Sequence, residues 1–95
     1  MFYIVCYDTP SNRRRTRLAR ALKDYAARVQ WSVFETHLPA DVYAKMLQRL
    51  AKIVDLAEDT LRIYPVPADS LAKVKLFGRP DITKVDEFYW VGRNR

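Results

Sequence analysis

Six consecutive apolar residues near the start of the chain, Phe2 to Tyr7, place the tightest constraint on its fold. The run is rich in β-branched and aromatic side chains, and the acidic residue Asp8 follows it directly. A short apolar run of this kind is typical of a central β-strand with both faces covered. It is too short for a signal peptide, and no stretch approaches the roughly 18 apolar residues of a membrane span. We therefore expect a cytoplasmic protein that makes no contact with membranes.

The period of the apolar residues changes to that of a helix after a turn at Pro10. Ser11 or Asn12 can cap this helix, which is predicted over residues 12–27. Its apolar face consists of Leu18, Ala21, Leu22 and Tyr25. Arg14 and Arg15 lie one turn before this face, so we expect both to project toward the end of the first strand, close to Asp8.

The remaining segments complete an alternation of strands and helices. Residues 28–38 predict one long or bent strand, or two short strands joined tightly. Pro39 opens a second helix, and residues 60–66 predict another strand. The order indicates an α+β domain with the ferredoxin-like βαββαβ arrangement and an extra C-terminal strand. All 95 residues form one domain, because the chain is too short for a barrel or a multidomain enzyme.

The second face of the sheet and the C-terminal tail predict a homodimer. Two helices cover one face of such a sheet and leave the other face bare. The tail, residues 75–95, contains an apolar cluster at 88–91 that has no obvious place to pack within one chain. A second copy covering sheet with sheet would bury both, with the tail as an exchanged strand. The alternative is that the tail folds back on its own sheet.

The positive charge of the chain is concentrated in one segment. Lys and Arg number 17 against 11 Asp and Glu, a formal net charge of +6. Residues 12–30 contain seven bases and one acid, whereas bases and acids balance in the rest of the chain. A charge run of this kind is either a solvated helix face or a surface that binds nucleic acid. We expect contacts to DNA or RNA phosphates from Arg13, Arg14, Arg15, Arg17, Arg20 and Arg28.

Asp8 is the candidate for chemistry. One cysteine, one histidine and two glycines exclude an intrachain disulfide, a Cys or His metal cluster and a Gly-rich phosphate loop. Asp8 either caps the turn or meets its own copy across a dimer axis, where two carboxylates would hold Mg²⁺ or Mn²⁺. Tyr7 and Phe34 are aromatic residues near this site, and their alternative role is packing in the core.

Four segments together resemble CRISPR-associated protein 2, the smaller adaptation protein of CRISPR systems, over nearly the whole chain. They are the strand ending Tyr7-Asp8, the arginine-rich helix start, residues 28–35 and residues 59–65. The resemblance implies a ferredoxin-like homodimer whose C-terminal strand crosses to the partner chain. It implies a role in spacer acquisition together with the CRISPR integrase subunit. It also implies a metal-dependent endonuclease activity on single-stranded RNA or double-stranded DNA.

The resemblance also assigns roles to single residues. The family aspartate of the metal site corresponds to Asp8, and the other family positions correspond to Tyr7, Arg15, Arg17, Arg28 and Phe34. Trp31 stands where many members carry tyrosine. Two other functions remain open: a nucleic-acid-binding dimer that performs no chemistry, and a toxin-like ribonuclease resembling virulence-associated protein D. An RNA-recognition module is disfavoured, because its pattern of aromatic residues around glycine is absent.

Overall fold

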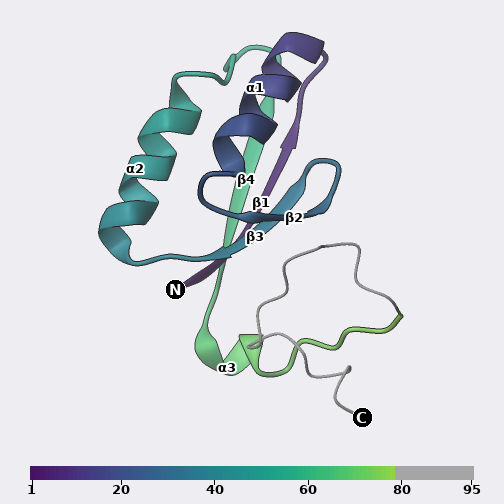
Figure 1. Cartoon of the computed structure of the whole chain (residues 1–95), viewed down its shortest axis with the longest axis vertical. Helices are drawn as coiled ribbons and strands as arrows, with labels where there is room; N and C mark the ends of the chain where they lie inside the picture. The colour runs from purple at the N-terminus through teal and green to yellow at the C-terminus, as the bar shows by residue number, and fades with distance from the viewer. Residues whose placement is uncertain (79–95) are drawn as a thin grey trace.

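The computed structural model describes residues 1–78. Within them the chain folds into four strands and three helices (Figure 1). In order, the elements are β1 (Phe2–Asp8), α1 (Asn12–Leu22), β2 (Ala27–Gln30), β3 (Val33–His37), α2 (Ala40–Ala51), β4 (Thr60–Val66) and α3 (Ala68–Leu71). No helix in this part of the chain is both long and apolar enough to cross a membrane.

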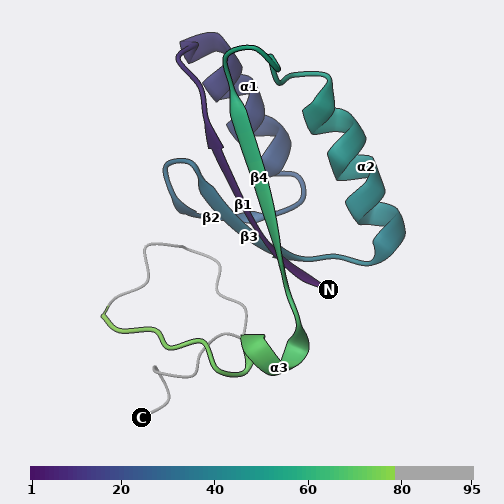
Figure 2. The ribbon, with the colours of Figure 1, turned by 180° about the vertical axis from the view of Figure 1, so that it is seen from behind.

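The four strands form one sheet in the order β2-β3-β1-β4, with every neighbouring pair antiparallel. Helices α1 and α2 cover one face, and the view from behind shows the strands of the opposite face in front of them (Figure 2). This arrangement confirms the predicted α+β class and is the ferredoxin-like βαββαβ order. The predicted extra strand within 75–95 and its apolar cluster lie almost wholly outside the described residues.

β1 has a neighbour on each side, which confirms the central strand expected from its apolar run. Val5 and Tyr7 face the helices and are buried, whereas Ile4 and Cys6 alternate with them and are only half-buried. The expectation that both faces are covered is therefore met on the helix side only. Within residues 1–78 the opposite face stays partly open.

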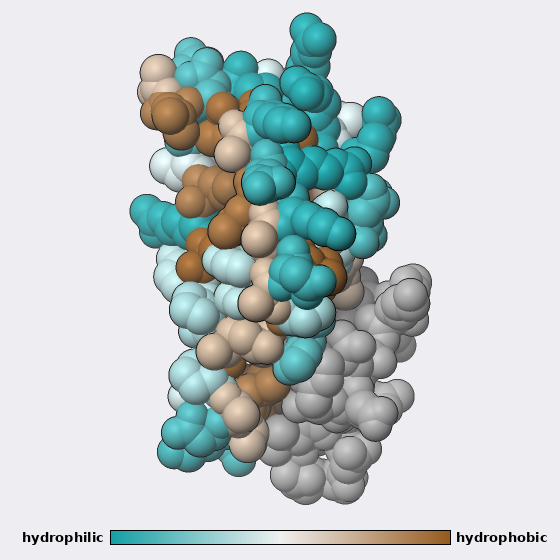
Figure 3. Space-filling model, turned by 90° about the vertical axis from the view of Figure 1, so that its left-hand side faces the viewer, coloured by the Kyte–Doolittle hydropathy of each residue, from teal (hydrophilic) through white to brown (hydrophobic). Residues whose placement is uncertain are grey.

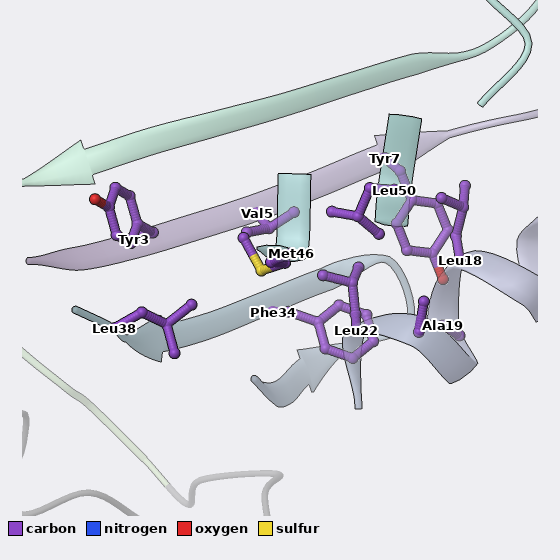
Figure 4. Close-up of a cluster of buried hydrophobic side chains, with 11 residues drawn as sticks. Tyr3, Val5, Tyr7, Leu18, Ala19, Leu22, Phe34, Leu38, Met46 and Leu50 are labelled. Carbon is purple, nitrogen blue, oxygen red and sulfur yellow. The ribbon is translucent and has the colours of Figure 1, made fainter. Parts of the chain in front are cut away.

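The core lies between the sheet and the two helices (Figure 4). Its completely buried side chains come from both layers: Val5 and Phe34 from the sheet, Leu18 and Leu22 from α1, and Met46 and Leu50 from α2. Burial of each such side chain contributes about 1.5–3 kcal/mol to folding. On the side of the molecule that carries α2, hydrophilic side chains lie over the helix and an apolar band runs beside them (Figure 3).

α1 ends at Leu22, five residues before the end predicted from its apolar period. The backbone N–H groups of Asp24 and Tyr25 bond to the carbonyls of Ala21 and Leu22, which tightens the chain into a turn that leads to β2. Tyr25 still packs against the core from this turn. Its side chain therefore fits the helical period although its backbone is not helical.

Residues 28–38 form two short strands, the second of the two arrangements that the sequence left open. The pairing of β2 with β3 contains a register shift between Arg28 and Gln30, which is an irregularity of the β-bulge kind. Trp31 lies in the turn between the strands and is 82% exposed. The alternative of one long strand over residues 28–38 is therefore excluded by this turn.

Candidate nucleic-acid interface

Asp8 is the last residue of β1 and is exposed on the face of the sheet opposite α1 and α2. The turn that follows is held by other residues: the Thr9 hydroxyl accepts a hydrogen bond from the Ser11 N–H, and the Ser11 hydroxyl caps α1 by accepting from the Arg14 N–H. The role of turn cap is thus filled without Asp8. Its carboxylate remains at the surface, available to a ligand.

Tyr7 and Phe34 point the other way, into the helix-covered side of the sheet. Phe34 is completely buried, and its ring centroid lies 6.3 Å from that of Tyr7. Figure 4 shows both rings within the core cluster. Successive residues of a strand face opposite sides, so Tyr7 and Asp8 diverge although they are adjacent in sequence. Within one chain, the structure does not bring these rings to the Asp8 carboxylate.

Helix α1 carries exposed arginines on the side away from the core. Its buried side is Leu18, Ala19, Ala21 and Leu22, whereas Arg13, Arg15, Arg17 and Arg20 are exposed. Arg15 also donates hydrogen bonds to the Thr9 carbonyl, at 2.7 Å, and to the Asn12 side-chain oxygen. Arg15 therefore projects toward the end of β1, as predicted.

Arg14 takes a different course from its neighbour. Its guanidinium donates to both carboxylate oxygens of Asp59, at 2.7 and 3.1 Å, and to Glu58 at 2.8 Å. The Asp59 side chain is completely buried and also accepts from the Asp55 N–H. These ion pairs tie the start of α1 to the segment before β4, and because Thr60 pairs with Asp8, they place Arg14 toward the end of β1 as predicted, with its guanidinium engaged by acids other than Asp8. No local signal marks contacts between residues 45 positions apart.

The ion pair shifts the titration of both partners. The hydrogen bonds from Arg14 hold the pKa of the Asp59 carboxyl far below its usual range. The same contacts, with help from Glu58, raise the pKa of the Arg14 guanidinium. Each charged form is stabilised by its partner. Arg14 thus stabilises the fold, with its guanidinium engaged inside the chain.

A hollow of about 300 Å³ lies between α1 and the β2–β3 hairpin. Its walls include four cations and two aromatic residues: Arg15, Arg20, Lys23, Arg28, Tyr7 and Trp31. The Arg28 guanidinium lies 5.3 Å from the ring centroids of both Trp31 and Phe34. The sequence pattern placed all four of these cations in one basic segment but did not join them to Trp31. A tryptophan at the point where the predicted strand could break into two was the sequence signal that could have marked Trp31 as a candidate binding residue.

A metal ion would find one suitable carboxylate at the end of β1. No cluster of three or more His, Cys, Asp or Glu side chains suited to a metal occurs among residues 1–78. Mg²⁺ keeps several waters and needs only one or two carboxylates. The donor set of Asp8 therefore fits Mg²⁺ or Mn²⁺ when a second chain supplies another carboxylate.

The sequence profile of the family described as CRISPR associated protein Cas2 matches residues 1–74. A protein of Synechocystis named CRISPR-associated endoribonuclease Cas2 3 is 42% identical, over 86% of this chain and 89% of its own length. A Thermus thermophilus protein named CRISPR-associated endonuclease Cas2 2 is 47% identical, over 67% of this chain and 71% of its own.

Solved structures share the fold. A hypothetical protein from Thermus thermophilus superposes with a TM-score of 0.73 and 40% identity, over 83% of this chain and 92% of that one. Streptococcus pyogenes Cas2 superposes with a TM-score of 0.72 and 29% identity, over 82% of this chain and all of that one. The profile match, the relatives and the common fold agree along the same residues, and the chain belongs to the Cas2 family of CRISPR-associated proteins.

Proposed function

We propose that this protein acts in CRISPR adaptation as a homodimer that binds nucleic acid and the integrase subunit, and that it hydrolyses phosphodiester bonds at a metal site built on Asp8. The observation that carries the proposal is the exposed carboxylate at the end of the central strand, next to a helix with an arginine-rich face. The names of the relatives, endoribonuclease and endonuclease, support a nuclease that acts on RNA or DNA.

The open face of the sheet supports the dimer. Ile4 and Cys6 are half-buried there, and Tyr64, which pairs with Ile4 in register, is 46% exposed. A second copy packed on this face would bury these side chains and bring the two Asp8 residues toward a common axis. The dimer would complete a site that one chain provides only by half.

Each group would then have a definite task. The two Asp8 carboxylates would hold Mg²⁺ or Mn²⁺, which would supply charge neutralisation at the phosphodiester and a more acidic water. Arg13, Arg17 and Arg20 would neutralise backbone phosphates along α1 and hold the strand in place. Contacts to phosphates do not distinguish one base from another, so we expect cleavage without strict sequence preference.

The test of the enzymatic proposal is Asp8→Asn, which keeps the size of the side chain and removes its charge. We expect cleavage of RNA and DNA to fall below detection, because the metal loses its charged ligand, while nucleic-acid affinity stays within about two-fold. Cleavage should also require added Mg²⁺ or Mn²⁺ in the intact protein. Asp41→Asn, an exposed aspartate in the first turn of α2, is the matched control and should leave cleavage unchanged.

Mixed dimers separate a shared metal site from two independent ones. A dimer with one intact and one Asp8→Asn chain should lose nearly all cleavage, since both carboxylates serve one ion. Half or more of the intact rate would contradict the shared site. Full cleavage by the homodimeric variant would place the activity elsewhere in the protein or in a contaminant.

A second candidate function is that of an architectural dimer, which binds nucleic acid without cleaving it. It is favoured because the arginines that would bind phosphates are different residues from Asp8, which would hold the metal. The exposed arginines of α1 do not depend on Asp8, and residues 1–78 contain no ready-made metal cluster. Spacer acquisition in cells carrying Asp8→Asn distinguishes the two functions. Acquisition at the normal rate would mean that holding DNA and the integrase suffices; its loss would mean that adaptation needs the nuclease.

A further inference from the structure

The hollow between α1 and the β2–β3 hairpin has the charge of an anion site. Arg15, Arg20, Lys23 and Arg28 line it, and no acidic residue among residues 1–78 does. Figure 1 shows α1 beside this hairpin. Like charges gathered around one cavity repel each other, and an anion between them relieves that repulsion. The hollow therefore suits a phosphate group better than an apolar ligand.

Arg28 adds a donor that the fold leaves unused. Its Nε is buried, and no hydrogen-bond acceptor among the described residues reaches it. A buried N–H without an acceptor is unfavourable, so such groups usually have a partner in the working state of a protein. A phosphate oxygen is an acceptor of the right charge. Arg28 lines the hollow, so an anion bound there would lie beside this donor.

Trp31 adds an aromatic surface at the same place. The residue is 82% exposed, yet the turn that carries it is anchored, since the Tyr7 hydroxyl donates to the Trp31 carbonyl at 3.3 Å and the Tyr7 N–H donates to the Ser32 carbonyl at 3.2 Å. An indole that is held in position and left open to solvent is a platform for a stacked base. Trp31 is not part of the hydrophobic core.

We propose that this hollow holds one unpaired nucleotide, with the base stacked on Trp31 and the phosphate among Arg15, Arg20, Lys23 and Arg28. Its volume lies at the lower end of the roughly 300–1,000 Å³ of small-molecule sites, which suits a single nucleotide. Bases inside a duplex already have both faces covered, so the hollow selects single strands or frayed ends. The inference deepens the proposed function by naming the strand form that the nucleic-acid interface prefers.

The experiment compares the affinities of a short oligothymidylate and a blunt duplex of equal length. All measurements use the Asp8→Asn protein without added metal, so that the result does not depend on cleavage. We expect Trp31→Leu to weaken single-strand binding by about five-fold or more and to leave duplex binding within two-fold. Trp31→Phe, which keeps an aromatic face, should retain most of the preference.

Paired substitutions on α1 provide the charge control. Arg20→Gln with Lys23→Gln removes two cations of the hollow and should lower the preference for single strands. Arg13→Gln with Arg17→Gln removes the same charge from two positions of α1 that do not line the hollow, and should weaken both ligands equally. An unchanged single-strand to duplex ratio in Trp31→Leu would overturn the inference, whatever the outcome for Asp8.

Fluorescence reports the contact directly. In a Trp90→Phe background Trp31 is the one tryptophan of the chain, and single strands should quench its emission more than duplex does. Thymidine 5′-monophosphate tests whether the site takes a free nucleotide or needs the strand. Saturable quenching by the oligonucleotide at lower concentration than by the monophosphate supports the strand. Quenching by the monophosphate with equal or higher affinity would contradict it.

Discussion

At the scale of single residues, the buried Asp59 carboxylate makes the stability of the fold depend on pH. Its pKa is lowered in the folded state, so its contribution is complete above the ordinary aspartate pKa of about 3.9 and is lost as pH falls toward the lowered value. We predict that the free energy of unfolding, measured by urea titration, falls steeply below about pH 4. Asp59→Asn should destabilise the protein at pH 7 and flatten this dependence, because Arg14 loses its charged partner.

Asp69→Asn is the control for this pair, since Asp69 is exposed and its side chain accepts a hydrogen bond from the N–H of its sequence neighbour Ser70. It should keep both the stability at pH 7 and its acid dependence. An Asp59→Asn protein that retains the steep loss below about pH 4 would assign the acid response to other carboxylates.

At the scale of elements, α1 divides its arginines between the fold and the ligand. Arg14 is engaged by acids, whereas Arg13, Arg17 and Arg20 face solvent. We predict that replacing these three by Gln weakens nucleic-acid binding and lowers the slope of log affinity against log salt by up to about 2–3, since each phosphate contact contributes about 0.7–0.9. Gln keeps a similar helix propensity, so circular dichroism should not change.

The matched control replaces three exposed lysines outside α1, namely Lys45, Lys52 and Lys73. The formal charge removed is the same, so a general loss of attraction would affect both triple variants alike. A slope that changes equally in the two proteins would mean that the whole surface binds, with no special part for α1.

At the scale of the whole molecule, α1 and α2 cover one face of the sheet, and we predict that a second copy covers the other. Light scattering should give a dimer at micromolar concentration. Tyr64→Lys places a charge on this face and should shift the protein toward monomers, because a buried ammonium is unfavourable. Truncation after residue 80 should likewise release monomers or aggregates.

Leu56→Lys tests whether any new charge would have this effect. Leu56 is 92% exposed in the segment between α2 and β4 and is not part of a strand, and the variant should remain dimeric. A monomeric intact chain at micromolar concentration would contradict the dimer and with it the shared Asp8 site.

The sequence by itself determined the order of elements, the central strand and the apolar faces of both helices. These features depend on the spacing of neighbouring side chains, which is a local property. The end of α1 was predicted too late because Tyr25 packs on the core without being helical. The spacing of neighbouring side chains also left two alternatives for residues 28–38, one long strand or two short ones, and did not decide between them.

Only the tertiary structure decided which charged and aromatic side chains meet. Arg14 finds Asp59, and Arg20, Lys23 and Trp31 come together around one hollow, through chain reversals that no periodicity encodes. The structure also separates Tyr7 from Asp8, since strand geometry turns adjacent residues to opposite faces. These contacts depend on the distance between side chains in the folded protein, whereas the sequence gives only their separation along the chain.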